Sequence, residues 1–295
     1  MGDMMNMLKF CASLLSASVI AGSAMAADLP SRKVAPAYVA PVPVFTWTGF
    51  YVGVNVGYGF GGSNSLTGTD FYLGNYPATV AGINTGFNGG GGNLNGILGG
   101  AQIGYNWQMN SLVLGLEADI QGAGLKSSNA LGPFPGNPAL GFIPFFTAGA
   151  TSQKVDWFGT LRGRLGFTVT PTLLAYVTGG LAYGDVKNSL TYTAVFPAVA
   201  GAIFTGTNST TSGRIGWTVG AGGEWAFSPN WSMKLEYLYT DLGNSSVGTV
   251  TAFGPAIPVQ PLFAPVVSRR TAFHTVRAGL NYRFGWASAP VVAKY

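Results

Sequence analysis

Charged side chains are scarce in this chain of 295 residues, and a group of them stands at alternate positions within apolar, aromatic segments. Such spacing places the charges on one face of a β-strand, opposite the apolar side chains. Acids and bases on a shared buried face could pair with one another, line an ion path or take part in acid–base chemistry. The candidate set comprises five acids and six bases: Glu117, Asp119, Asp156, Glu224, Glu236, Arg162, Arg164, Arg214, Lys234, Arg277 and Arg283.

The residue types of most catalytic and metal sites are nearly absent. The chain has one histidine, His274, and one cysteine, Cys11, so it can form neither a histidine dyad nor a multi-histidine metal site. The alternation of side chains along the last strand puts His274 on the apolar face, at the outer end of that strand. We interpret it as an interfacial residue. The glycine-rich residues 86–96 lack the Lys-Ser/Thr of a phosphate loop. The sequence therefore predicts no enzyme, no metal and no resident cofactor.

Residues 1–26 have the features of a secretion signal. A short apolar run, residues 10–22, follows Lys9, and Ala24-Met25-Ala26 has the small-x-small form that a signal peptidase cuts after. The run is too short to cross a bilayer as a helix. We expect the mature chain to begin at Ala27, without Cys11 and hence without disulfide or thiolate chemistry.

Composition points to a membrane protein. Charged residues make up 8% of the chain and aromatic residues 13%, and there are 45 glycines, whereas an ordinary soluble domain has about 25% charged residues. After the signal, no stretch reaches the roughly 18 apolar residues of a membrane helix. A closed β-barrel is the other structure that can span a bilayer. The net charge of +5 is too diffuse to indicate a nucleic-acid partner.

Alternation of apolar and small or polar residues predicts the strands. In residues 50–60, for example, the apolar side chains occupy the even positions, and glycine and asparagine occupy most of the odd ones. In residues 173–184 both faces are apolar or small, so the pattern predicts a strand there but leaves its register open. The predicted strands are residues 50–60, 97–107, 112–121, 155–168, 173–184, 214–225, 231–239 and 275–284.

The connections alternate between short and long. Three short ones carry turn residues, at Asn110-Ser111, Thr170-Pro171-Thr172 and Ser228-Pro229-Asn230. The long connections are residues 61–96, 122–154, 185–212 and 243–270. This pattern predicts an all-β fold, an eight-stranded antiparallel transmembrane up-and-down β-barrel with short periplasmic turns and four long extracellular loops.

Two features indicate that the apolar face points outward into lipid, although a secreted lipocalin-like barrel also alternates, with its apolar face inside. The polar face is mostly Gly, Thr, Asn and Gln, which suits a narrow interior better than a water-facing surface. Aromatic side chains also gather at strand ends on the apolar face, as in interfacial girdles. The predicted girdle consists of Tyr58, Phe60, Trp107, Trp157, Phe167, Trp225, Phe227, Trp231 and Tyr239.

Several stretches resemble the porin-family group of small outer-membrane immunogenic proteins of alphaproteobacteria. They include WTGFYVGVNVGYGFG, TLRGRLGF, WSMKLEYLYTDLG and FHTVRAGLNYRF, and the resemblance covers all eight strands but not the long loops. It implies an eight-stranded barrel in a Gram-negative outer membrane. It also implies that the barrel-insertion machinery reads the closing strand, with Leu280, Tyr282 and Phe284 as its signal. Members of this group are expected to end at the final aromatic, whereas this chain continues beyond Phe284.

These observations give a predicted domain organisation. Residues 1–26 are the signal peptide, residues 27–45 a proline-rich periplasmic lead, residues 46–284 the barrel and residues 285–295 a C-terminal extension. The extension either modifies the insertion signal or forms a periplasmic tail.

The interior of an eight-stranded barrel is only wide enough for side chains. Unpaired charges there would be costly, so we expect the candidate charges to form an ion-pair network that fills the lumen. Such a plug argues against a general diffusion porin. It serves either as structural fill or as a narrow, gated path for ions.

The apolar, proline-punctuated connections 132–146, 194–204 and 252–267 are the candidates for surface contact. They either pack as a cap or against lipopolysaccharide, or they bind another barrel, a host molecule or haem, for which a tyrosine or His274 would have to be the ligand. The expected role is structural and one of surface contact, with outer-membrane lipid and lipopolysaccharide as surroundings.

Overall fold

The computed structural model describes residues 45–62, 66–69, 92–135, 146–196, 202–247 and 266–284, all of which belong to one compact unit. The predicted signal peptide, the lead up to residue 44 and the C-terminal extension lie outside the described residues. The same is true of residues 136–145, 197–201 and 248–265, which hold much of the apolar connections. Within the described residues, no helix is long and apolar enough to cross a membrane.

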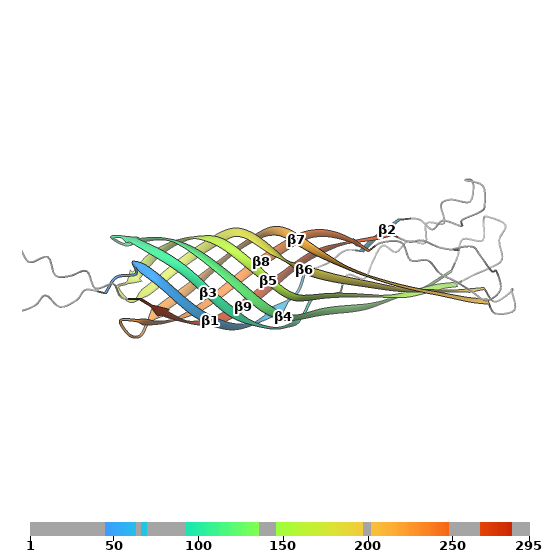
Figure 1. Ribbon diagram of the computed structural model, residues 1–295, viewed down its shortest axis with the longest axis horizontal. Coiled ribbons are helices and arrows are strands. Elements are labelled where there is room, and N and C mark those ends of the chain that lie inside the picture. The colour runs from blue at the N-terminus through green and yellow to red at the C-terminus, as the bar shows by residue number, and fades with distance from the viewer. Residues whose placement is uncertain are drawn as a thin grey trace, which may run out of the picture. The chain divides into compact units, whose positions relative to one another are not determined.

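Eight strands form a closed ring (Figure 1). Each pairs antiparallel with the next along the chain, and β9 pairs back with β1, which confirms the predicted eight-stranded up-and-down barrel. A further short strand, β2 (Leu66–Thr69), extends the sheet at β9. The ring comprises β1 (Gly49–Phe60), β3 (Gly96–Met109), β4 (Leu112–Pro135), β5 (Phe146–Thr170), β6 (Leu173–Phe196), β7 (Ala202–Ala226), β8 (Trp231–Val247) and β9 (Val266–Arg283).

Short turns join β3 to β4, β5 to β6 and β7 to β8 at the places where the sequence predicts them. Asn110 has a φ of 55°, a left-handed conformation that asparagine tolerates and that suits a two-residue hairpin turn. These turns lie at one end of the barrel, which we call the short-turn end.

Side chains alternate between lumen and outer surface, as the pleat of a strand requires. In β1, Val54 is 62% exposed on the outer face, whereas Tyr51 is 2% exposed inside. The structure also fixes the register of β6, which the sequence leaves open. Leu174 and Tyr176 point inward, and Val177 and Leu181 point outward.

The middle strands are much longer than predicted. β5 and β7 have 25 residues each, against about 10 needed to cross a bilayer. The prediction that residues 122–154 and 185–212 are loops is therefore wrong for most of their length. Beyond the apolar belt, outward positions such as Ser152 and Ser189 are polar, so the ladder continues after the apolar alternation has ended.

A bulge in β5 reverses the inside–outside parity beyond the belt. The register shifts between Val155 and Trp157, because Asp156 is an extra residue in the pairing with β6. Val155, expected to face lipid, is fully buried in the lumen, whereas Trp157 remains on the outside. The prediction that Asp156 belongs to the lumen is wrong, because its half-exposed carboxylate pairs with Lys154 and Lys187 on the outer face.

Candidate functional site

The centre of the lumen holds a cluster of eight ionised side chains, which we call the ion cluster. Neighbouring strands supply partners directly across the ladder, because Glu117 is opposite Arg162 and Glu236 is opposite Arg277. All eight side chains are at most 3% exposed. Acids and bases are equal in number, so their formal charges cancel. The ion cluster consists of Glu117, Asp119, Glu224, Glu236, Arg162, Arg164, Lys234 and Arg277.

Arg162 is the hub of this cluster. Its guanidinium pairs with Glu117, lies 3.0 Å from Asp119 and donates to Glu236 across 2.9 Å. Arg277 binds two of the same acids, with Nη2 at 2.5 Å from Glu236 and Nη1 at 3.4 Å from Asp119. Each of these carboxylates therefore contacts two cations, which offsets the cost of burying it.

A second group of contacts lies around Arg164. Its Nη2 donates to Glu224 across 2.5 Å, and its Cζ lies 3.7 Å from the centroid of the Tyr176 ring. The Tyr51 hydroxyl donates to Glu117 across 2.6 Å and accepts from Arg164 across 3.2 Å. Neither tyrosine is among the predicted site residues. Alternation puts Tyr51 on the same face as the lumen-facing glycines, but it carries no formal charge, and Tyr176 lies in the segment whose register the sequence leaves open.

A glycine makes room for one of these rings. Gly104 faces the lumen beneath Tyr51, and a Cβ at this position would lie 2.4 Å from the Tyr51 Cζ. Lumen glycines of this kind explain how eight strands can enclose tyrosines as well as the ion cluster.

Replacing Tyr51 by phenylalanine is expected to lower the free energy of unfolding by about 1–3 kcal/mol, because a buried Arg164 N–H then lacks its acceptor and Glu117 loses a donor. Urea titration of the refolded barrel in lipid vesicles measures the change. Tyr105→Phe on the lipid-facing side of β3 is the matched control, and it should have little effect. Equal losses for the two variants would contradict the role assigned to the Tyr51 hydroxyl.

A cluster of buried apolar side chains lies in the lumen on the side of the ion cluster away from the short turns. Phe158 and Phe273 meet there edge to face, with ring centroids 5.3 Å apart. Neither ring is exposed to solvent. We call this set the apolar layer: Leu94, Leu98, Leu125, Val155, Phe158, Ala182, Val186, Leu242 and Phe273.

A second buried apolar cluster lies at the short-turn end. Trp47 is 1% exposed, packs in one cluster with Val113 and Leu174, and donates its indole N–H to Pro171 O across 3.2 Å. Arg283 holds this segment in place. Its Cζ lies 4.8 Å from the Trp47 ring, and its Nη1 donates to Thr46 O across 2.8 Å.

The two remaining predicted lumen bases stand apart from the ion cluster. Arg283 forms the contacts described above and has no ion pair among the described residues, so its expected place in the network is wrong. Arg214 is half-buried and likewise unpaired within the described part of the chain.

Arg269 is a lumen residue outside the predicted set. It lies beyond the apolar layer and is 2% exposed, and Nη2 donates to Ser127 across 2.9 Å and to Gly92 O across 3.1 Å. Burial lowers its pKa to about 10, so it is still a cation at neutral pH. Arg269 lies in a segment where apolar and polar residues do not alternate, so the sequence pattern does not predict that its side chain faces the lumen.

The outer surface carries the predicted aromatic girdle, and Trp107, Trp225 and Trp231 are exposed on it. His274 also lies on this surface, as its parity indicates. Its Nδ1 is 2.6 Å from the Tyr237 hydroxyl, and its ring contacts Phe60 and Tyr239. Most of the remaining girdle residues are exposed as well, namely Tyr58, Phe60, Trp157, Phe167 and Phe227, whereas Tyr239 is partly covered.

At the end of the closing strand, Leu280 and Phe284 are exposed, and Tyr282 stacks edge to face on Phe284.

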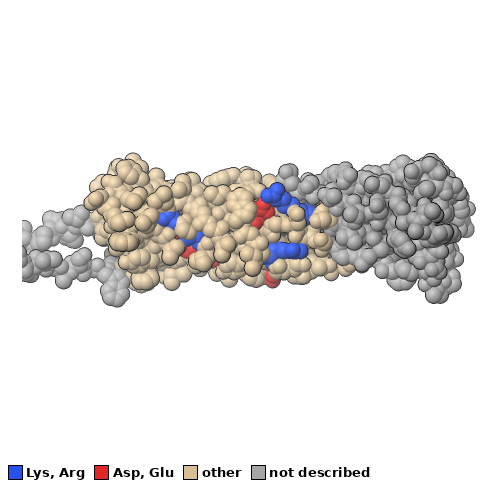
Figure 2. Space-filling model, turned by 90° about the horizontal axis from the view of Figure 1, so that it is seen from above, with Lys and Arg blue, Asp and Glu red and all other residues tan. Residues whose placement is uncertain are grey.

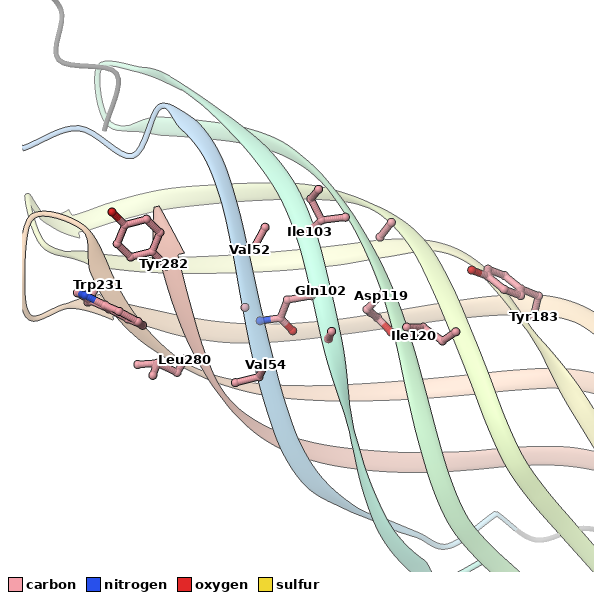
Figure 3. Close-up of a pocket in the computed structure, with 13 residues that line it drawn as sticks. Val52, Val54, Gln102, Ile103, Asp119, Ile120, Tyr183, Trp231, Leu280 and Tyr282 are labelled. Carbon is pink, nitrogen blue, oxygen red and sulfur yellow. The ribbon is translucent and has the colours of Figure 1, made fainter. Parts of the chain in front are cut away.

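A hollow of about 660 Å³ lies on the outer face of the barrel (Figure 3). Val52, Val54, Ile103, Ile120 and Leu280 line it, and all five are exposed aliphatic side chains of the lipid-facing belt. We assign this hollow to contact with acyl chains. Across the described residues, no group of three His, Cys, Asp or Glu side chains could hold a metal ion.

An apolar outer face with aromatic girdles around a charged interior defines an integral membrane β-barrel. The family model described as outer membrane protein beta-barrel domain matches residues 12–284, and the chain belongs to this family of the bacterial outer membrane. Its relatives include the 31 kDa outer-membrane immunogenic protein of Brucella melitensis, 38% identical over 91% of this chain and 96% of that protein. The resemblance to alphaproteobacterial outer-membrane immunogenic proteins is thus confirmed.

Two further similarities concern parts of the chain or its general architecture. The 22 kDa outer membrane protein of Rhizobium leguminosarum bv. viciae is 34% identical over 48% of this chain and 52% of its own length. Among solved structures, the outer membrane protein OprG from Pseudomonas aeruginosa is 11% identical, with a TM-score of 0.41 and coverage of 82% of this chain and 99% of that one.

Proposed function

We propose that this protein is a closed, non-enzymatic structural barrel with a role in surface contact, rather than a pore. The observation that carries the proposal is the filling of the lumen. A neutral cluster of eight charges occupies its centre, and apolar side chains lie on both sides of the cluster. An ion that entered would have to displace paired charges and also cross a dry layer, and either step is costly.

The surface-contact part of the proposal rests on the apolar connections 132–146, 194–204 and 252–267. The described ends of the first two, at Pro135 and Phe146 and at Phe196 and Ala202, are the far ends of the long ladders of β4 to β7, well beyond the apolar belt. A segment so placed can meet another barrel, a host molecule or haem. His274 is held among aromatic rings on the outer face, which supports an interfacial role rather than catalysis or ligation.

Single-channel recording of the refolded protein in planar bilayers tests the closed lumen. Wild type should be silent. Arg162→Ala/Arg164→Ala opens only the ion cluster and Phe158→Ala/Phe273→Ala only the apolar layer, so each double variant should leak little. The quadruple variant should conduct steadily, because both barriers are then removed.

A gel-shift assay for the heat-sensitive folded form confirms that each variant has refolded before it is recorded. Steady openings of the wild type would overturn the closed barrel and establish the rival function, a narrow ion path through the cluster. A silent quadruple variant that is fully folded would show that other side chains close the lumen.

A further inference from the structure

Three lysines form a row on the outer face of the barrel, just beyond the apolar belt. Lys126 of β4 is directly opposite Lys154 of β5, which is directly opposite Lys187 of β6. Paired residues on adjacent strands have Cα atoms about 5 Å apart, so the three lysines span only about 10 Å. Lys126 and Lys187 are exposed, and Lys154 is partly exposed.

Like charges directly opposite one another destabilise a sheet, so this row needs anions. Asp156 supplies one, since it pairs with Lys154 and, across 2.9 Å, with Lys187. These contacts, that with Lys154 first, lower the pKa of the carboxyl group, which remains ionised at neutral pH. Lys126 has no ion pair among the described residues. Asp185, nearer the belt, accepts a hydrogen bond from the Trp157 indole across 2.9 Å, and the group of five charges is net positive.

The outer face around the row changes in steps along the strands. On the membrane side lie the lipid-facing Leu161 and Leu181, followed by the edge-to-face pair Trp157 and Tyr183. The lysine row comes next, four residues beyond Tyr183 along β6, which is about 13 Å of strand. On the face seen in Figure 2, charged side chains are few, and the larger group of them lies toward one end of the described barrel.

Hydroxyl groups continue the same face beyond the row. Ser128, Ser152, Ser189 and Ser209 stand directly opposite one another across β4, β5, β6 and β7. Ser189 donates to Ser209 across 3.1 Å, and a shallow hollow of about 270 Å³ is lined by Ser128, Ser152 and Ser189. The order is therefore aliphatic, aromatic, cationic and hydroxylated.

We propose that this face of β4 to β7 is a docking surface for a phosphorylated glycolipid of the outer leaflet, such as lipopolysaccharide. Its acyl chains lie against Leu161 and Leu181, its phosphate groups meet Lys126, Lys154 and Lys187, and its sugars meet the serine row. Charge complementarity selects the phosphates, and the hydroxyl groups supply the hydrogen bonds that sugars take. Docking at this surface depends on the location of the barrel in the membrane and is independent of whether the lumen conducts.

The test measures binding of diphosphorylated lipid A to the refolded full-length protein in detergent micelles, with dephosphorylated lipid A in parallel. Wild type should prefer the phosphorylated lipid. Lys126→Gln/Lys154→Gln/Lys187→Gln should weaken its binding about tenfold or more and abolish the preference. The triple Lys→Arg variant should retain both, because the positive charges remain. Arg270→Gln is the matched control, since it removes an exposed outer cation on β9.

Several results would overturn the proposal. Wild type could bind the two lipids equally, or the triple Lys→Gln variant could keep the preference. Arg270→Gln could lose as much as the lysine variant, which would indicate a general charge effect. Competition by inorganic phosphate at the same concentration would show that a free anion, and not a lipid headgroup, occupies the row.

Discussion

Replacing Arg162 by methionine is expected to lower the free energy of unfolding of the barrel by about 3–5 kcal/mol. Arg162 contacts Glu117, Asp119 and Glu236, and none of its side chain is exposed. Methionine fills much of the same volume but leaves a buried excess of one negative charge. The loss of charge balance, rather than the loss of volume, should therefore dominate the effect.

Equilibrium unfolding in urea, followed by tryptophan fluorescence in lipid vesicles, measures this loss. Arg214→Met is the matched control, because Arg214 also lies on the lumen side but has no ion pair among the described residues. It should change stability by less than about 1 kcal/mol. Arg162→Lys should fall between the two, since it keeps the charge and loses the fork that reaches three acids. Equal effects of the two methionine variants would refute the hub role of Arg162.

Much of this interior follows from parity in the sequence. The eight strands and the inward direction of the ion cluster both result from a strict period of two within the membrane. In β4, Glu117 and Asp119 are two residues apart and both face the lumen, as do Arg162 and Arg164 in β5. Register then determines which charges meet, and the sequence alone did not specify the pairs.

The two-residue alternation does not predict side-chain direction correctly where a bulge interrupts it. The bulge at Asp156 exchanges the two faces of β5, so Val155 enters the lumen and Asp156 leaves it. No residue in this stretch signals a bulge, since neither glycine nor proline marks the position. The same irregularity turns Lys154 to the outer face, where it completes the lysine row.

Parity also could not reveal the apolar layer. Leu125, Phe158 and Phe273 are apolar side chains on a face that elsewhere is polar, and in β5 the outward neighbour Trp157 is apolar as well. Where both faces are apolar, alternation carries no information about direction. The burial of Trp47 was not predicted for a different reason. Trp47 lies before the first strand, and it packs inside the barrel through tertiary contacts.

Truncating Phe158 to alanine is expected to cost about 3–5 kcal/mol of unfolding free energy, because the cavity left in the apolar layer cannot collapse against a rigid wall of strands. Phe167→Ala is the matched control. It makes the same change on the same strand, but at a lipid-facing position that is 58% exposed. Its loss should be clearly smaller, because lipid can fill the space that the ring vacates.

The same urea titration distinguishes two pictures of the lumen. A large loss for Phe158→Ala beside a small one for Phe167→Ala means that the apolar layer is a packed core and contributes stability alongside the ion cluster. Similar losses at both positions would mean that water already reaches Phe158, and a hydrated layer could not serve as the second barrier of a closed barrel. The loss of unfolding free energy in Phe158→Ala therefore bears directly on whether the lumen can conduct.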